Sequence, residues 1–171
     1  MKNLFRLANG WCFLIMLVSC SKDSKEIILK PGEGIHHDDF QYVVTDYSVI
    51  KRIGFTEDST GMDGNFYVVN FKVINNAVRV DHPWNNSIAY LIDEKGNTYE
   101  NQQSLQEKFN NVSPFGFKKD YITSFQTTDT TVFIFELPPS VKHPYLMVRG
   151  ETLMGDFFDG NQFRKTKVKL F

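Results

Sequence analysis

Apolar and polar positions alternate with a period of two along most of the chain after residue 40, which is typical of β-strands with unlike faces. The segment GNFYVVNFKVIN (64–75) has apolar residues at every odd position from 67 to 73, so we expect a strand buried on that face. The segment TTVFIFELPP (130–139) repeats this alternation and ends at two prolines, which cannot continue a ladder. The pattern predicts that both are central strands of one core.

Weaker alternation predicts further strands at 40–45, 48–53, 88–93, 98–100, 121–125, 145–149 and 163–171. Residues 93–97 have the composition of a hairpin turn in which Gly96 takes a positive φ. The last strand carries lysines at 165, 167 and 169, a row that suits an exposed or edge position. Residues 101–109 lack β-branched side chains and place Leu105 four residues before Phe109, which predicts a short helix.

Many short strands with turn residues between them indicate an all-β protein. We therefore expect an immunoglobulin-like antiparallel β-sandwich with a short helix or long loop insertion near 101–120. The alternation begins only after a polar segment with Pro31, Gly32 and Gly34 near its end. This places the sandwich domain at 35–171 and a polar tether at 20–34.

The N-terminus has the pattern of a secretion signal. Lys2 and Arg6 precede the apolar run WCFLIMLV (11–18), and no acidic residue occurs before residue 20. Eight residues rise only about 12 Å as a helix, against about 30 Å of bilayer hydrocarbon, which disfavours a membrane-spanning segment. We expect residues 1–19 to be a signal peptide that is removed.

The tetrapeptide LVSC (17–20) resembles the lipobox of bacterial lipoproteins, in which the cysteine becomes the first mature residue and carries lipid. The resemblance implies lipidation of Cys20 and attachment to the membrane; an ordinary secretory signal is the alternative. Ser21, by similarity to the sorting rule of Gram-negative lipoproteins, favours the outer membrane. The charged residues 22–26 resemble export tags of Bacteroidetes surface lipoproteins, and both the periplasmic face and the cell surface stay open.

Composition narrows the remaining classes of protein. Removing residues 1–19 takes away two basic residues, so a formal net charge of −1 becomes −3, which does not suggest a nucleic-acid partner. The two cysteines are Cys12, in the signal, and Cys20. The folded part therefore has no thiol for a disulfide, a nucleophile or a cysteine metal site. The chain has sixteen phenylalanines, two of them in residues 1–19, and seven tyrosines, and these rings are available for the core instead.

Three segments together are similar to an extracytoplasmic immunoglobulin-like (telokin-like) family known as domain of unknown function 4352. They are YVVNFKVINN, IAYLIDEKGNTYE and TTVFIFELPPSVKHPYLMV, which match a strand ending in asparagine, a hairpin ending in Gly-x-x-Tyr and a phenylalanine-rich strand ending at proline. The similarity covers roughly 40–148, and residues 101–120 and those beyond 150 depart from it. It implies the fold and supplies no catalytic residues.

Aromatic residues in turn-rich segments are the candidates for binding. Trp84 lies in DHPWNN (81–86), where an exposed indole could stack on a sugar or anchor a protein, although packing against the sandwich is the alternative. Phe115 and Phe117 raise the same question. Phe157 and Phe158 lie in GDFFDGN (155–161), which lacks the ligand spacing of a calcium loop.

No chemical motif points to catalysis or to a cofactor. His36 and His37 are adjacent, so on an extended chain they point to opposite faces and do not readily share a metal ion. The chain has no Gly-x-Ser-x-Gly, His-Glu-x-x-His or phosphate-binding loop. We expect a non-catalytic protein-interaction or assembly module of the envelope without metal or cofactor. A lipoprotein that binds a glycan or small ligand and an unrecognised envelope hydrolase are the alternatives.

Overall fold

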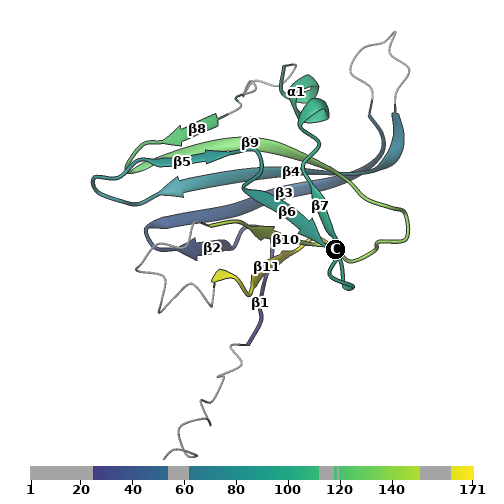
Figure 1. Cartoon of the computed structure of the whole chain (residues 1–171), viewed down its shortest axis with the longest axis horizontal. Coiled ribbons are helices and arrows are strands. Elements are labelled where there is room, and N and C mark those ends of the chain that lie inside the picture. The colour runs from purple at the N-terminus through teal and green to yellow at the C-terminus, as the bar shows by residue number, and fades with distance from the viewer. Residues whose placement is uncertain (1–24, 54–61, 112–117, 119, 151–162) are drawn as a thin grey trace, which may run out of the picture.

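The computed structural model describes residues 25–53, 62–111, 118, 120–150 and 163–171, which form two stacked sheets, a two-stranded ribbon and one helix (Figure 1). The elements are β1 (Ile27–Leu29), β2 (Gly34–His37), β3 (Phe40–Ile53), β4 (Met62–Asn75), β5 (His82–Asn85), β6 (Ala89–Ile92), β7 (Thr98–Glu100), α1 (Gln103–Asn111), β8 (Asp120–Thr123), β9 (Thr127–Glu136), β10 (Tyr145–Val148) and β11 (Thr166–Lys169).

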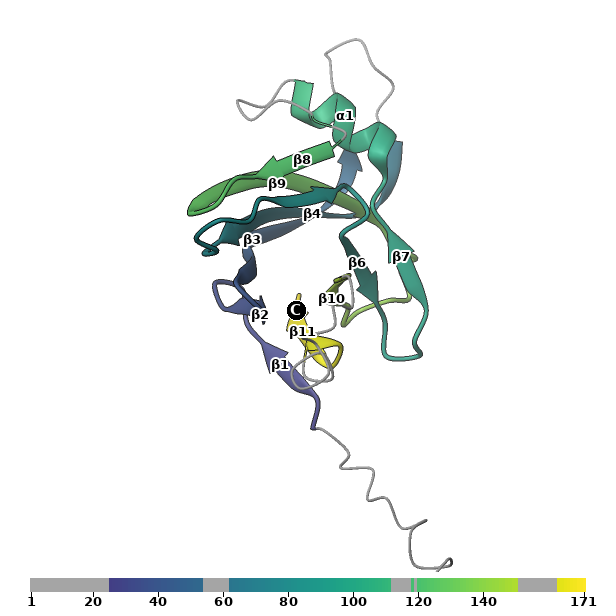
Figure 2. The same ribbon diagram turned by 60° about the vertical axis from the view of Figure 1, so that its left-hand side comes forward.

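The two large sheets lie face to face as a β-sandwich (Figure 2). One has the strand order β1-β11-β10-β6-β7 and the other the order β2-β3-β4-β9. Strands β5 and β8 pair with each other and form the separate ribbon. The parallel pair β1 and β11 is the exception among the named pairings, which are otherwise antiparallel. The expected all-β sandwich with a short helix near residue 101 is therefore confirmed.

The main core fills the space between the sheets. From β4, Val69 and Val73 are fully buried, and the ring of Phe71 lies 5.1 Å from that of Phe133 on β9. The opposite sheet contributes buried residues from three strands, namely Leu91, Leu146 and Val168. Burial of each large apolar side chain contributes roughly 1.5–3 kcal/mol, so the alternation seen in the sequence is the main source of stability.

Strands β4 and β9 are also buried on their outer face, where the sequence predicted a half-exposed strand. Helix α1 covers this face, as both views show (Figures 1 and 2). Beneath it lies a second core whose members are Ile53, Phe66, Val68, Leu105, Val132 and Ile134. The expectation failed because a nine-residue helix distant in sequence supplies the cover, and alternation within a strand carries no information about it. The helix itself was predicted to within two residues at each end.

Two local features of the sheets follow the sequence closely. The predicted strands 40–45 and 48–53 are one strand, and the expected break corresponds to a register shift between Val44 and Asp46. The turn after β6 has Gly96 at a φ of 85°. Hydrogen bonds from the Asn97 side chain, from the Asn97 and Lys95 backbones and from the Tyr99 hydroxyl lower the pKa of Asp93 there. The hairpin turn is therefore confirmed.

The segment expected to be a tether takes part in the fold. Residues Ile27–Leu29 form β1 and pair in parallel with β11, and Leu29 packs against the main core. The ammonium of Lys167 lies 2.7 Å from a Glu26 oxygen beside this pair. Strand β11 therefore lies between β1 and β10 and is an inner strand of its sheet. The row of lysines had suggested an exposed or edge position, and the edge position is wrong. Parallel pairing joins segments from opposite ends of the chain, so no local turn signal announces it.

Candidate functional site

Trp84 lies in strand β5 and not in an exposed loop. Its side chain is 6% exposed and belongs to the main core. The indole stacks on the ring of Tyr121 with centroids 3.9 Å apart, and its Nε1–H donates to Thr123 Oγ1 at 2.8 Å. Of the two alternatives left open for Trp84, packing against the sandwich is the one observed: DHPWNN contains a strand whose inward positions are His82 and Trp84.

The other residues singled out in the sequence lie outside the described part of the chain. These are Cys20, Phe115, Phe117, Phe157 and Phe158. Their roles in lipidation and in binding stay predictions. Gly150 and Phe163, the described residues on either side of 151–162, both contact His37.

One buried amide bonds both ends of the β5–β8 ribbon to the end of β4. Asn75, the last residue of β4, is 1% exposed, and its Nδ2 donates to Val80 O at 2.7 Å and to Thr123 O at 2.9 Å. Its Oδ1 accepts the backbone N–H of Ala77 at 2.9 Å. The side chain thus uses both amide hydrogens and its oxygen, which satisfies the requirement that buried polar groups be paired.

A cleft of about 410 Å³ lies beside β5, between it, the β2–β3 hairpin and the end of β10. Six consecutive residues, 80–85, line it. Alternate side chains of a strand point to opposite faces, so a lining of consecutive residues means that β5 borders the cleft with its edge. The remaining lining residues are His37, Phe40, Tyr42, Ser87, Ile88, Arg149 and Gly150.

Two imidazoles in the cleft are each stacked on a phenylalanine ring. His82 lies 4.1 Å from Phe40, between ring centroids, and its Nε2 is hydrogen-bonded to the Tyr42 hydroxyl at 2.9 Å. His37 lies 4.3 Å from Phe163, and this pair separates the cleft from a second one of about 380 Å³ beside β1. Stacking fixes the orientation of both imidazoles.

Two residues near these imidazoles are constrained by their surroundings. Burial, with a smaller contribution from the nearby Asp38 carboxylate, raises the pKa of Tyr42 well above its usual range, so its hydroxyl stays protonated. Gly150 passes so close to the second stack that a Cβ there would lie 2.7 Å from the Phe163 ring. A side chain at position 150 would therefore displace the ring.

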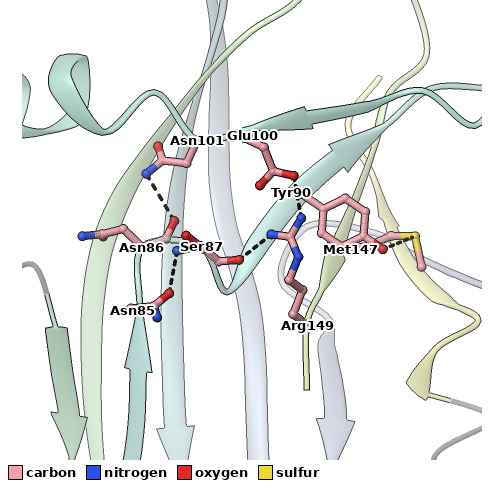
Figure 3. Close-up of polar contacts among 8 residues, drawn as sticks. All are labelled: Asn85, Asn86, Ser87, Tyr90, Glu100, Asn101, Met147 and Arg149. Atoms are coloured by element: carbon pink, nitrogen blue, oxygen red, sulfur yellow. Dashed lines mark hydrogen bonds and ion pairs between the residues drawn. The ribbon is translucent and has the colours of Figure 1, made fainter. Parts of the chain in front are cut away.

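Arg149 closes one end of the cleft and is held rigidly (Figure 3). Its Nη1 donates to Ser87 O and its Nη2 donates to a Glu100 oxygen at 2.6 Å. The guanidinium also lies 4.3 Å from the ring centroid of Tyr90, whose hydroxyl donates to the Met147 sulfur. A guanidinium has five N–H donors, and these bonds use only two of them.

Apolar side chains are exposed on the ribbon and at its ends. Val78, Val80, Ile122 and Phe125 are each more than half exposed, at 69%, 58%, 66% and 52%. Ile122 lies directly opposite Pro83 in the strand pair, and the Phe125 N–H donates to Asp81. We call these four residues with Pro83 the ribbon patch. Val80 and Pro83 also line the cleft, so the two features are continuous.

Sequence reasoning missed a buried amide network behind the ribbon. Gln106 of α1 is fully buried, and its Nε2 donates to Asn86 Oδ1 at 2.7 Å and to Thr131 Oγ1 at 3.3 Å. Asn101 donates to the Gln106 oxygen and accepts the Ile134 N–H, while Asn86 donates to Lys118 O. Amides that read as polar loop residues therefore join the helix to the sheet.

The described residues offer little for metal or proton chemistry. Among them, no three His, Cys, Asp or Glu side chains are grouped so that they could hold one metal ion. The helix in this part of the chain is too short and too polar to cross a bilayer. The arrangement provides a concave surface with one fixed cation, two oriented imidazoles and an apolar rim.

Comparisons with known proteins bear on the fold alone. No protein-family model matches the chain, and a search of curated proteins found no match. Among solved structures, the chain is similar to the yjhA protein of Bacillus subtilis, with 15% identity, a TM-score of 0.55, and coverage of 84% of this chain and 99% of that one. A conserved hypothetical protein of Bacillus anthracis is 14% identical with a TM-score of 0.55, and the match covers 75% of this chain and 93% of that one. An uncharacterized β-sandwich protein of Clostridium difficile is 16% identical with a TM-score of 0.52, and the match covers 88% of this chain and 97% of that one.

These likenesses show the fold alone, a β-sandwich similar to those of three bacterial proteins, an uncharacterized one among them. The identities are too low to transfer a function. The expected membership in the family of domain of unknown function 4352 gains no support from the family comparison and stays a resemblance.

We predict that Trp84→Ala lowers the free energy of unfolding by about 3–5 kcal/mol, because it removes a buried ring and the partner of Thr123. Pro83→Ala is the matched control, since Pro83 is exposed in the same strand. Denaturant unfolding followed by circular dichroism measures both. Equal stability of Trp84→Ala and wild type would contradict the placement of this indole in the core.

Proposed function

We propose that this protein is a non-catalytic binding module, anchored outside the cytoplasm by lipid on Cys20, whose protein partner docks on the ribbon patch and the cleft. The observation that carries the proposal is the continuity of these two features. Four side chains more than half exposed lie on the ribbon or next to its ends, and Val80 and Pro83 of the ribbon patch also line a cleft whose lining includes Arg149. Exposed apolar clusters beside a concave site are typical of interaction surfaces.

The anchor is supported by the order of charge, apolar run and cysteine at the N-terminus. Ile27, the first residue of β1, follows Cys20 by seven positions, so an extended chain would hold it within about 25 Å of the lipid. The described chain begins at the end of the sandwich opposite α1 (Figure 2). Lipid on Cys20 would thus keep the β1 end near the bilayer and direct α1 away from it. Ser21 supports an outer-membrane location, on either face.

The structure of the ribbon patch favours a protein as the partner. Pro83 and Ile122 project from the paired strands, and Asn75 bonds both ends of the ribbon to the sandwich, so little conformational entropy is lost when a partner covers these two side chains. Tyr90 and Met147 lie beside Arg149 and extend the surface past the cleft (Figure 3). Buried apolar anchors of this kind commonly supply most of the binding energy.

A second candidate is binding of a glycan or another small ligand in the cleft. Its volume of about 410 Å³ falls within the usual range of ligand pockets, roughly 300–1,000 Å³. The aromatic residues Phe40, Tyr42 and Trp84 contribute to the lining. An envelope hydrolase, the third expectation, has no supporting observation among the described residues.

We predict that Cys20→Ala abolishes lipid attachment, because the thioether needs the cysteine sulfur. Cells are labelled with an alkyne analogue of palmitate, and the labelled protein is detected after capture. Ser19→Ala is the control, because a small residue before the cysteine is retained and labelling should persist. Equal labelling of wild type and Cys20→Ala would contradict the anchor.

We predict that replacing Ile122 and Phe125 together by serine reduces partner recovery at least about tenfold, since such anchors often contribute 2 kcal/mol or more. The melting temperature should stay within about two degrees of wild type because both side chains are exposed. Val49→Ser is the control, as Val49 is 43% exposed on β3. Chemical crosslinking in the native envelope, followed by capture and mass spectrometry, measures partner recovery by these variants. In the otherwise unchanged protein, a photoreactive residue placed at position 122 or at position 49 tests the surface separately. Equal crosslinking from both positions would contradict the docking surface.

A further inference from the structure

The cleft combines groups that recognise a carboxylate with an apolar lining. Arg149 and the imidazoles of His37 and His82 line it, against one carboxylate, that of Asp81. Asp81 Oδ1 already accepts the backbone N–H of Phe125 at 3.2 Å. The charge of Arg149 is shared with Glu100, so the lining is biased toward hydrogen-bond donors.

Arg149 presents its donors in a defined direction. The bonds to Ser87 O and Glu100 and the contact with the Tyr90 ring hold the guanidinium at the end of the cleft (Figure 3). Three of the five N–H donors remain beyond these two bonds. A planar guanidinium recognises a carboxylate through paired N–H donors, and a fixed one loses less entropy on binding than a mobile side chain.

The apolar part of the cleft fits the body of a ligand. Phe40, Val80, Pro83, Trp84 and Ile88 contribute to the lining, and the rings of Phe40 and Trp84 are fixed by stacking on His82 and Tyr121. A volume of about 410 Å³ admits a ring or a branched side chain together with its carboxylate. The two kinds of lining meet at Ser87 and Ile88, beside Arg149.

We propose that the cleft binds a carboxylate carried on an apolar or aromatic body, with Arg149 as the residue that selects the carboxylate. This rests on the proposed binding function and specifies its ligand. Two sources share the chemistry: the C-terminal residue of the protein partner, and a free organic acid. In both, the carboxylate lies at Arg149 and the body lies against Phe40 and Ile88.

The test uses the purified full chain and two probes, N-acetylphenylalanine and its amide. Titration is followed by ¹⁵N-resolved NMR, with shifts expected at residues 80–88 and 149–150. The free acid should bind at least about tenfold more tightly than the amide, because the amide removes a charge-assisted hydrogen bond. Equal affinity of acid and amide, or no binding of either, would overturn the proposal.

Variants locate the selecting group. Arg149→Gln should abolish the tenfold preference for the acid. Arg52→Gln is the control and should retain the preference, since Arg52 on β3 is another exposed arginine that lies beside a carboxylate, that of Asp63. Arg149→Lys keeps the charge without the paired donors and should lower the preference by several-fold while preserving the fold. A preference unchanged in both Arg149 variants would exclude Arg149 as the selecting residue.

A third probe separates the two sources. N-acetyl-Ala-Ala-Phe with a free C-terminus should bind more tightly than N-acetylphenylalanine if the source is a protein C-terminus, and no more tightly if it is a free acid. Failure here is distinguishable from failure of the proposed function. If position 122 crosslinks to a partner but the cleft shows no preference for the acid, the docking surface is supported and the carboxylate site is overturned. If the cleft prefers the acid but position 122 does not crosslink, the carboxylate site is supported and the docking surface is overturned.

Discussion

The arrangement of the binding region depends on the buried amide of Asn75. Its two donated hydrogen bonds attach Val80, two residues before β5, and Thr123, the last residue of β8, to the end of β4, and its accepted bond shapes the turn at Ala77. Loss of this amide would leave the buried Thr123 carbonyl without this donor, at about 1–3 kcal/mol, and would expose the partly buried Val80 carbonyl to water. The attachment sets the position of β5, and β5 sets one wall of the cleft.

The remaining architecture makes this end of the sandwich the accessible one. Residues 65–69 of β4 and 131–135 of β9 are buried on both faces, by the opposite sheet on the inside and by α1 on the outside. Gln106 ties the helix to Asn86, just beyond β5, so the cover and the ribbon are linked by buried polar contacts. Among the described residues, the ribbon patch and the cleft are therefore the surface on which the proposed partner would dock.

Sequence reasoning succeeded where the signal was local. The alternation at 64–75 and 130–139 and the turn around Gly96 depend on near neighbours, and the structure has them as expected. It failed where burial depends on distant segments. Trp84 sits in a run of turn-forming residues, and only pairing with β8, more than thirty residues later, reveals it as core.

The candidate site shows the same limit more strongly. His37, His82 and Arg149 come from three separated segments, and the fold alone brings them to one cleft. Asn75 was noted as the end of a strand, but its partners at residues 80 and 123 left no pattern in the sequence. The parallel pairing of β1 with β11 was missed for this reason as well.

Hydrogen–deuterium exchange of Asn75→Ala tests most directly whether this amide positions the binding region. Asn76→Ala is the matched control, because Asn76 is exposed beside it. The account predicts faster exchange at residues 80–85 and 120–125 in Asn75→Ala alone, with β3, β4 and β9 still protected. Unchanged protection of the ribbon, or an equal loss across those three strands, would contradict it.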